Sequence, residues 1–371
     1  MAAAALPALA QASTQPTETQ LSVATSSYRE DGVNREDVLT GSARRYEIDV
    51  HQFQLTAPVG ESWSAGLAVS REIMSGASPA AGVQGIDGTP RLIMSGASIR
   101  DARNATDLSI TKHLDRGAIS TSIMVSNEDD YESYSGVVNG ELDLGDGLTT
   151  LGAGFSYAED TLEPSDALVT GRIEQESRFS SSGTLSVTRV INARTVLQGG
   201  LSYTRHSGFL SDPYKLLDVR PATRERWSLS ARLRHFVAPA HAAWHLDYRS
   251  YQDNWGVDAH TLETAWYQNL GGGVQLVPWV RYYTQDGAAF FDYTDDFTAP
   301  PDQHKSSDHR LAPFGAFSYG VRFHFRAPRW GMRLGVERYT SSGDYGLSNA
   351  ELNHPAEVQF TRASIGWDLR F

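Results

Sequence analysis

The feature that most constrains the fold is an alternation of apolar and polar residues with period two, which recurs in short segments along most of the chain. Residues 227–234 and 317–326 show it, and the last segment, TRASIGWDLRF, shows it most clearly. Such alternation predicts β-strands with one apolar face. No apolar run approaches the roughly 18 residues that a transmembrane helix needs, so the sequence excludes a helical membrane protein. In the last segment the apolar parity consists of Ala363, Ile365, Trp367, Leu369 and Phe371.

Three further patterns favour a membrane β-barrel over a soluble sandwich, whose strands also alternate. Tryptophans recur at the ends of the apolar stripes, as the interfacial girdles of a membrane barrel require. Short and long connections alternate strictly along the chain. The last residue of the final strand is Phe371, a feature similar to the assembly signal of outer-membrane barrels, so the barrel-assembly machinery is an expected partner. The tryptophans are Trp63, Trp227, Trp244, Trp330 and Trp367.

The connections give the number of strands. The seven short ones are residues 58–61, 115–117, 145–147, 192–194, 239–241, 271–273 and 328–331. The eight longer or more polar ones are residues 31–42, 74–99, 127–133, 158–170, 208–223, 252–258, 287–313 and 341–355. Fifteen connections predict sixteen strands, in an all-β, transmembrane, antiparallel up-and-down barrel with both termini on the periplasmic side. The alternation changes parity within residues 46–55, where we expect a β-bulge.

The first residues, MAAAALPALAQA, look like the end of a secretory signal: a short apolar stretch, then an A-x-A cleavage site at residues 10–12. We therefore expect residues 1–12 to be a truncated signal peptide and residues 13–371 to form one barrel domain. The expected location is the bacterial outer membrane, reached through the periplasm, with lipid and lipopolysaccharide around the wall. The chain has no cysteine, which excludes disulfides, thiolate metal sites and cysteine nucleophiles.

If the apolar parity faces lipid, the other parity faces the lumen, and beyond residue 226 it is rich in arginine. Nine arginines accompany four carboxylates there, although the chain carries a formal net charge of −12. The surplus acid lies in loops such as residues 127–133, 158–166 and 292–297. An arginine-lined lumen favours anions over cations; alternatively, the arginines pair with nearby carboxylates and only stiffen the wall. The predicted lumen-lining residues are Arg232, Arg234, Asp247, Arg249, Glu263, Arg281, Arg322, His324, Arg326, Arg333, Glu337, Arg362, Asp368 and Arg370.

The hexapeptide IMSGAS occurs twice, at residues 73–78 and 93–98. Its glycines allow close approach of two backbones, and two copies are too few for a repeat array. A catalytic serine would need a partner base and a G-x-S-x-G context, and neither is present. We interpret the copies as the two limbs of one loop, residues 74–99, folded across the barrel mouth. The predicted constriction residues are Ser75, Gly76, Ser78, Ser95, Gly96 and Ser98.

Few other residues have the pattern of a chemical site. Residues 302–309 (DQHKSSDH) have a metal-like composition but no regular element to fix them, so we interpret them as a polar loop. His206 and Ser207 are adjacent in sequence, which is a poor match to a catalytic pair. No metalloprotease, P-loop or dinucleotide motif occurs, and the negative charge opposes nucleic-acid binding. We therefore expect no enzymatic activity, cofactor or metal. A rim cluster, read either as a ligand site or as a hydrogen-bonded tight loop, comprises Asp253, Asp258, His260 and Tyr283.

Several stretches, in order, resemble an outer-membrane β-barrel family catalogued as domain of unknown function 3570. The resemblance covers nearly all of the chain after residue 12. It implies a bacterial outer-membrane β-barrel and no particular biochemical activity. Such proteins tend to be encoded near thioredoxin-like and flavin-transferring proteins, which implies a periplasmic redox partner. The matching stretches are the SGAS pair with Arg100, Asp101 and Arg103 after it, residues 211–215 (SDPYK), 220–221 (RP), 248–249 (YR), 253–256 (DNWG), 260–261 (HT) and 281–285 (RYYTQ).

These patterns lead to two hypotheses of function. The first is a channel or binder for small, anionic solutes. The second is a closed structural barrel that holds an envelope redox or electron-transfer partner, with its lumen filled by the loop of residues 74–99. A third class, an integral-membrane enzyme, has the least support in the sequence.

Overall fold

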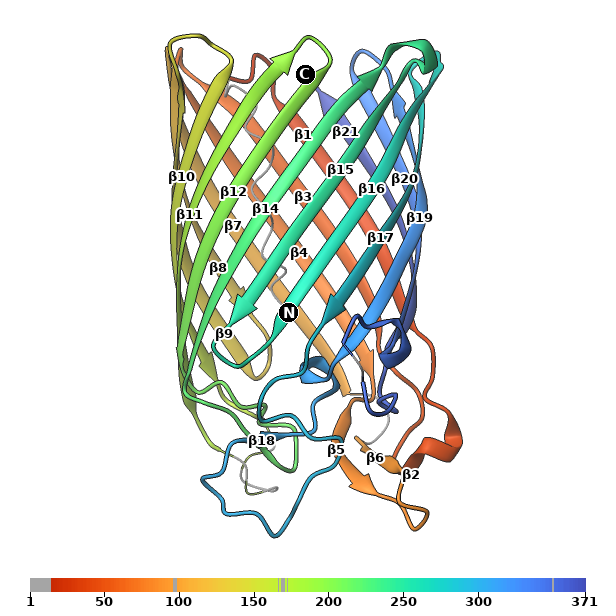
Figure 1. Ribbon diagram of the computed structural model, residues 1–371. Coiled ribbons are helices and arrows are strands. Elements are labelled where there is room, and N and C mark those ends of the chain that lie inside the picture. The colour runs from red at the N-terminus through yellow and green to blue at the C-terminus, as the bar shows by residue number, and fades with distance from the viewer. Residues whose placement is uncertain (1–14, 96–98, 166, 168–170, 172, 349) are drawn as a thin grey trace.

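The computed structural model describes residues 15–95, 99–165, 167, 171, 173–348 and 350–371. Sixteen antiparallel strands form a closed barrel, in which each strand pairs with its neighbours in the chain and β1 pairs with β21 to close the ring (Figure 1). The strands are β1 (Gln20–Glu30), β3 (Glu47–Val59), β4 (Trp63–Gly76), β7 (Ile99–Leu114), β8 (Gly117–Asn127), β9 (Tyr131–Asp143), β10 (Thr149–Leu162), β11 (Glu176–Asn192), β12 (Thr195–Gly208), β14 (Thr223–Val237), β15 (Ala242–Asp253), β16 (Asp258–Gly271), β17 (Val274–Gln285), β19 (Phe314–Arg326), β20 (Trp330–Ser342) and β21 (Gln359–Arg370).

The predicted fold class and strand number are confirmed. The seven short connections lie at one end of the barrel and the eight long ones at the other (Figure 1). The start of β1 and the end of β21 both lie at the short-turn end of the barrel. There the Thr19 amide donates a hydrogen bond to the Phe371 carbonyl at 2.9 Å. Among the described residues, no helix is long and apolar enough to cross a membrane.

The β-bulge predicted within residues 46–55 is wrong. β3 pairs with β1 and with β4 without any shift of register. The change of parity has another cause: Ile48 and Val50 belong to the inward parity of the strand, whereas Phe53 belongs to the outward one. The outward parity becomes polar at His51, where the strand reaches the edge of the apolar band. Shifts of register occur instead beside two short turns, in the β11–β12 and β16–β17 pairs.

The outward face of the wall is apolar and carries aromatic side chains at both ends of its apolar band. Trp63 and Trp330 are exposed at the short-turn end, and Trp227 is exposed near the long loops. Trp244 also faces outward and donates its indole N–H to Thr264 Oγ1 at 2.8 Å. This arrangement matches the aromatic girdles of transmembrane β-barrels. Large apolar side chains that remain exposed over the band include Leu108, Ile123, Val138, Leu185 and Leu229.

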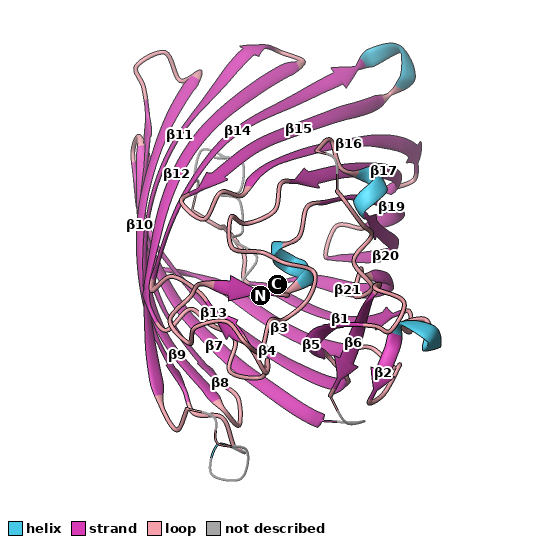
Figure 2. Ribbon diagram, turned by 60° about the horizontal axis from the view of Figure 1, so that its bottom comes forward, coloured by secondary structure: helices cyan, strands magenta, loops and turns pink. Residues whose placement is uncertain are grey.

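The long loops have compact structure of their own. β2 (Val38–Thr40), β6 (Pro90–Met94) and β5 (Pro79–Gln84) form a small sheet, and β13 (Asp218–Val219) pairs with β18 (Lys305–Ser306). Three 3₁₀ turns of the described residues lie in the long loops: η1 (Arg35–Asp37), η3 (His309–Leu311) and η4 (Gly343–Tyr345); η2 (Ala238–Ala240) lies in the short β14–β15 connection at the other end. Two of the three buried apolar clusters lie at the long-loop end: one comprises Val38, Ala77, Leu92, Met94 and Ala356, the other Trp255, Val257, Ala288 and Leu311. Figure 2 shows these loops running across the mouth of the barrel.

Candidate functional site in the lumen and its cap

The fourteen predicted lumen-lining residues all lie on the inward parity of the strands from β14 to β21, and we call this set the arginine wall. Cross-strand register places them side by side. Asp247 pairs with Arg232 on one neighbouring strand and with Glu263 on the other, and Glu263 pairs in turn with Arg281. Arg322, His324 and Arg326 continue the set on β19, and Arg362, Asp368 and Arg370 complete it on β21.

Each carboxylate of the arginine wall already has an arginine partner. Four arginines of the set are therefore paired with carboxylates, as the structural alternative predicted. The set contains nine arginines and four carboxylates, so its residues carry an excess of positive charge. The pairs are Arg234–Asp247, Arg281–Glu263, Arg333–Asp368 and Arg362–Glu337, with N–O distances of 2.8, 2.5, 2.8 and 2.6 Å.

Arg322 is held against an aromatic ring instead of a carboxylate. Its guanidinium carbon lies 4.6 Å from the ring centroid of Trp279, and that of Arg281 lies 5.7 Å from the same ring. Trp279 is only 6 % exposed. Gly320 of β19 pairs with it, and a Cβ there would clash with the Val336 carbonyl oxygen and come within 3.0 Å of the indole nitrogen, so the glycine leaves room for both the β20 backbone and the ring. Among the described residues, Arg322 forms no ion pair.

Trp279 was not among the predicted lumen-lining residues. An inward signal was present, because Val277 and Trp279 place two apolar side chains on the otherwise polar parity of β17. Both are buried, with Ala265 of β16, in an apolar patch of the inner wall.

A cavity of about 650 Å³ crosses the lumen beside Trp279. Arg322 and Arg333 line it on one side, and Gln52 and Met124 line it on the other. The strands of Met124 and Trp279, β8 and β17, are eight positions apart in the sixteen-strand ring, so the cavity reaches from one wall to the opposite one. A solute in this cavity would meet Asp107 among uncharged side chains on one side, and on the other the guanidinium groups of Arg322, Arg333 and Arg362 beside Glu337.

The long-loop mouth is covered by a cap, which we define as residues 77–95, 209–222, 286–313 and 350–358. Hydrogen bonds join its segments directly: the Leu216 amide donates to the Ala80 carbonyl at 2.8 Å, and the Asp295 amide donates to the Gly82 carbonyl at 2.7 Å. A Cβ on Gly82 would come within 2.6 Å of the Tyr293 carbonyl oxygen, so this approach requires glycine. The loops of Gly82 and Asp295 leave the ring with four strands between them on one side and eight on the other. The cap therefore spans the mouth.

The two SGAS stretches meet at the base of the cap. The Ser78 amide donates to Ser95 Oγ at 3.0 Å, and the Ser95 amide donates to the Ser78 carbonyl at 2.9 Å. Gly76 has a φ of 132°, and Ser75 pairs with Glu47 at the end of the β3–β4 ladder. Gly96 and Ser98 lie outside the described residues. Ser75 and Gly76 belong to β4, whereas β5 and β6 of this loop lie beyond the ends of the barrel strands (Figure 1), which corrects the second hypothesis where it has this loop fill the lumen.

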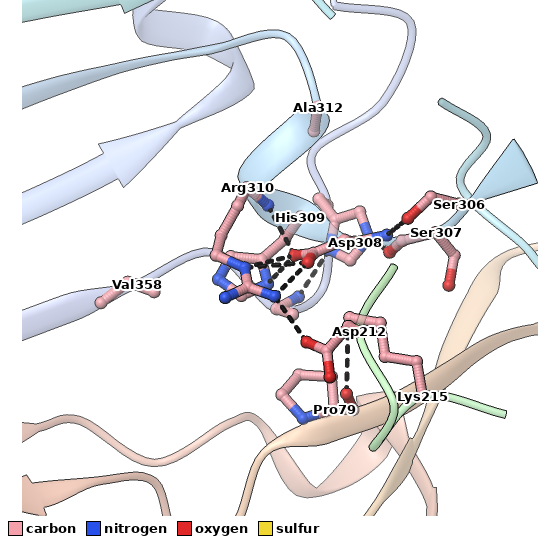
Figure 3. Close-up of polar contacts among 12 residues, drawn as sticks. Pro79, Asp212, Lys215, Ser306, Ser307, Asp308, His309, Arg310, Ala312 and Val358 are labelled. Carbon is pink, nitrogen blue, oxygen red and sulfur yellow. Dashed lines mark hydrogen bonds and ion pairs between the residues drawn. The ribbon is translucent and has the colours of Figure 1, made fainter. Parts of the chain in front are cut away.

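Buried ion pairs hold the cap segments together. Asp308 accepts hydrogen bonds from Arg220 Nη2 at 2.7 Å and from Arg310 Nε at 2.8 Å, and Arg310 Nη2 reaches Asp212 at 2.7 Å (Figure 3). Burial alone would raise the pKa of Asp308, but the charges of Arg310 and Lys215 outweigh it and hold the pKa well below its usual value. Asp308 thus remains ionised and joins two segments of the cap, residues 209–222 and 286–313.

Two buried histidines lie beside this network. His354 Nδ1 accepts the Ala356 amide at 3.0 Å, and its Nε2 lies 3.2 Å from the Ser307 carbonyl, which only an Nε2–H can reach as a donor. The ring is therefore neutral, and burial lowers its pKa to about 4. Burial also lowers the pKa of His309 well below its usual value. The DQHKSSDH segment is thus part of the packed cap, and its Asp308 and His309 contact other protein groups.

The predicted rim cluster does not form one site, which corrects that grouping. Asp253 and Tyr283 belong to the inward parity of their strands, whereas Asp258 and His260 belong to the outward one. Asp253 accepts the amides of residues 255 and 257 at 2.9 and 3.0 Å, as a hydrogen-bonded tight loop requires. His260 lies on the outward face, where its Nδ1 is 2.9 Å from the hydroxyl of Tyr248.

One group of carboxylates among the described residues has the spacing of a metal site. Oxygens of Asp101, Glu128 and Asp130 lie within 4.8 Å of one another at the long-loop ends of β7 and β8. Burial and the neighbouring Asp101 raise the pKa of Glu128 to about 7. Oxygen ligands of this kind suit hard divalent cations, and the group lies apart from the arginine wall.

Comparisons with known proteins agree with this architecture. The chain resembles a bacterial polysaccharide outer membrane secretin at a TM-score of 0.50 and 9 % identity, covering 95 % of this chain and 98 % of that one. Weaker likenesses are to the siderophore receptor PirA from Acinetobacter baumannii (TM-score 0.48, 12 % identity, 89 % of this chain and 53 % of that one) and to OpdK of Pseudomonas aeruginosa with vanillate (0.45, 9 %, 95 % and 98 %). No curated protein matches the sequence. The profile of the family described as "Protein of unknown function (DUF3570)" matches residues 1–355, and the chain belongs to that family.

Proposed function

We propose that the protein is a bacterial outer-membrane barrel that binds or passes small anions through its lumen, and that the cap controls the outer mouth. The observation that carries the proposal is an excess of positive charge at a cavity of about 650 Å³, which Arg322, Arg333 and Arg362 line together with the carboxylates of Asp107 and Glu337. Arg322 lines this cavity with its guanidinium against Trp279. A guanidinium held in this way can offer its N–H groups to an oxyanion in two parallel hydrogen bonds.

The cap supports a gated conduit in place of a permanently open pore. A sixteen-stranded barrel is wide enough for an aqueous channel unless loops close it. Here segments from distant parts of the ring are bonded to one another across the mouth, as in the contact of Gly82 with Asp295. Passage of a solute then requires the cap to open or to shift.

The same cap also favours the second hypothesis, a closed scaffold for an envelope redox partner. The two hypotheses differ in what the arginine wall does: a conduit exposes it to solutes, whereas a scaffold uses it only to stiffen the barrel. Neither assigns a catalytic step to the protein. In both hypotheses, the partners of the outer barrel surface are the surrounding lipid, lipopolysaccharide and the barrel-assembly machinery.

Conductance with a switchable cap tests the conduit. The chain has no cysteine, so Ala80→Cys with Leu216→Cys would place one disulfide between two cap segments that already share a hydrogen bond. We expect the reduced protein in a planar bilayer to show open events with an anion-selective reversal potential under a salt gradient. Oxidation should abolish them, and the Ala80→Cys single variant should not respond.

Two outcomes would contradict the conduit. If the folded protein never conducts, even after Gly82→Val has destabilised the cap, the closed scaffold is the hypothesis that remains. A conductance that is cation-selective would remove the role given to the arginine wall.

A further inference from the structure

The lipid-facing surface carries a groove that the proposed conduit does not use. Its volume is about 450 Å³, and it lies over β1, β3, β4 and β21. Its floor is formed by Val23 and Thr25 of β1. Val23 pairs in register with Trp367 on one side and with Phe53 on the other. The groove exists because small side chains on β1 lie between large rings on both neighbouring strands.

One end of the groove is polar and cationic. Thr25, His51 and Arg71 follow one another in register across β1, β3 and β4, on the side of the long loops. The Thr25 hydroxyl lies 3.1 Å from His51 Nδ1. When the hydroxyl donates that bond, the proton of the neutral imidazole is on Nε2, which is then available to a further acceptor.

Arg71 differs from other outward arginines near the long loops. Arg29 lies 3.1 Å from Asp49, Arg338 lies 2.5 Å from Asp31, and Arg205 lies 3.8 Å from Glu225. Arg71 is exposed and forms no ion pair among the described residues. It is therefore a cationic group with no carboxylate partner, at the edge of an apolar groove.

We infer that this groove binds one phosphorylated lipid of the outer leaflet, with an acyl chain over Val23 and a headgroup phosphate on Arg71 and His51. Charge complementarity selects the occupant, because an unpaired arginine at the membrane interface attracts an anionic headgroup and the apolar floor suits a hydrocarbon chain. The inference requires the barrel to lie in the membrane, as proposed above, but it does not depend on conduction through the lumen.

Lipid retention tests the site. The purified barrel is mixed in detergent with lipid A, and bound lipid is counted by native mass spectrometry. Arg71→Gln should lower retention about fivefold, the factor expected for one interfacial charge. Val23→Phe, which fills the groove and keeps the charge, should lower it as well. Arg338→Gln is the matched control, because that outward arginine is paired with Asp31, and it should retain as much lipid as the wild type.

The headgroup is tested with dephosphorylated lipid A, which the wild type should retain less than lipid A itself. Added inorganic phosphate should not displace lipid A, because phosphate lacks the acyl chain that the groove holds. Equal retention by the wild type, Arg71→Gln and Val23→Phe would overturn the inference, and so would an equal loss in Arg338→Gln. Conductance is measured on the same variants and should not change, because Arg71 and Val23 lie on the outer surface. A loss of lipid retention can therefore be distinguished from a failure of the proposed conduit.

Discussion

The cap and the arginine wall use the same chemical pair, an arginine with a carboxylate, in two different environments. In the cap, the side chains of Asp308 and Arg220 are 0 % and 11 % exposed. In the wall, those of Asp368 and Arg333 are 33 % and 52 % exposed. A buried pair is costly to break because one charge is left without a partner, whereas a solvated pair contributes little to stability. The cap pairs therefore fix geometry, and the wall pairs leave positive charge available to solutes.

The largest difference is expected when one carboxylate is removed from each region. Asp308→Ala leaves Arg220 and Arg310 without their shared partner, and should destabilise the closed cap by about 3–5 kcal/mol. Asp368→Ala, the matched change in the wall, should cost less than ~1 kcal/mol. Hydrogen exchange of the amides in residues 286–313 measures cap opening in both variants. Equal protection in the two would contradict the distinction between buried and solvated pairs.

Protonation of His354 in acid should weaken the closed cap. Its pKa is about 4 in the closed cap, because burial disfavours the charged ring, and about 6.5 once it is exposed. Protonation would also place an N–H at Nδ1, opposite the Ala356 amide that now donates to that atom. The contribution of His354 to the closed cap is therefore complete above pH 6.5 and falls by up to about 3 kcal/mol as the pH falls from 6.5 towards 4. Glu357 and Asp295, whose pKa values burial raises to about 7 and about 6, act in the opposite direction.

The check is the pH dependence of conductance or of amide exchange in the cap. His354→Gln keeps an acceptor and a donor but cannot be protonated, so it should remove the part of the acid response that His354 contributes, while the buried His309 continues to contribute its own part. The wall should not show this response. If His354→Gln opens between pH 6.5 and 4 as the wild type does, the titrating group lies elsewhere.

The wall could be predicted from the sequence, and the cap could not. A strand repeats its facing residues every two positions, so the parity of Trp367 or Leu229 was enough to assign lipid and lumen. The cap has no period, and its contacts join residues far apart in the chain, such as Gly82 with Ser307 at a separation of 225 residues. The sequence showed that residues 302–309 are polar, but a local sequence pattern cannot show which distant residues they contact.

Two predictions failed where the polarity of one strand face changes although the strand continues with period two. The parity change within residues 46–55 looked like a bulge because polar side chains replaced apolar ones on the outward face, although the strand continues in register. Trp279 was missed for the converse reason, since an apolar side chain occupies the inward face. In both cases the surroundings of a position, and not its parity, determine which residue type it carries.

A smaller effect is expected on selectivity when an unpaired arginine is removed from the wall. Arg322→Gln takes one positive charge from the cavity while Trp279 keeps its place against Gly320. We expect the anion-to-cation permeability ratio to fall roughly fivefold, which corresponds to ~1 kcal/mol of barrier, with no loss of stability. The reversal potential under a salt gradient measures it, and Arg205→Gln on the lipid-facing side is the control. An unchanged ratio would mean that ions do not pass near Trp279.

A small change in stability is expected for the complementary substitution, Glu337→Gln. Glu337, 9 % exposed, is paired at 2.6 Å with Arg362, 53 % exposed. Because the guanidinium is solvated and glutamine keeps an acceptor at the buried position, the loss of the ion pair should cost about 1 kcal/mol. The substitution nevertheless releases a guanidinium into the cavity that both residues line. Thermal unfolding should therefore change little while anion selectivity rises, the reverse of the result with Arg322→Gln. A fall in stability as large as that of Asp308→Ala, without any gain in selectivity, would mean that the wall pairs are structural in the same way as those of the cap.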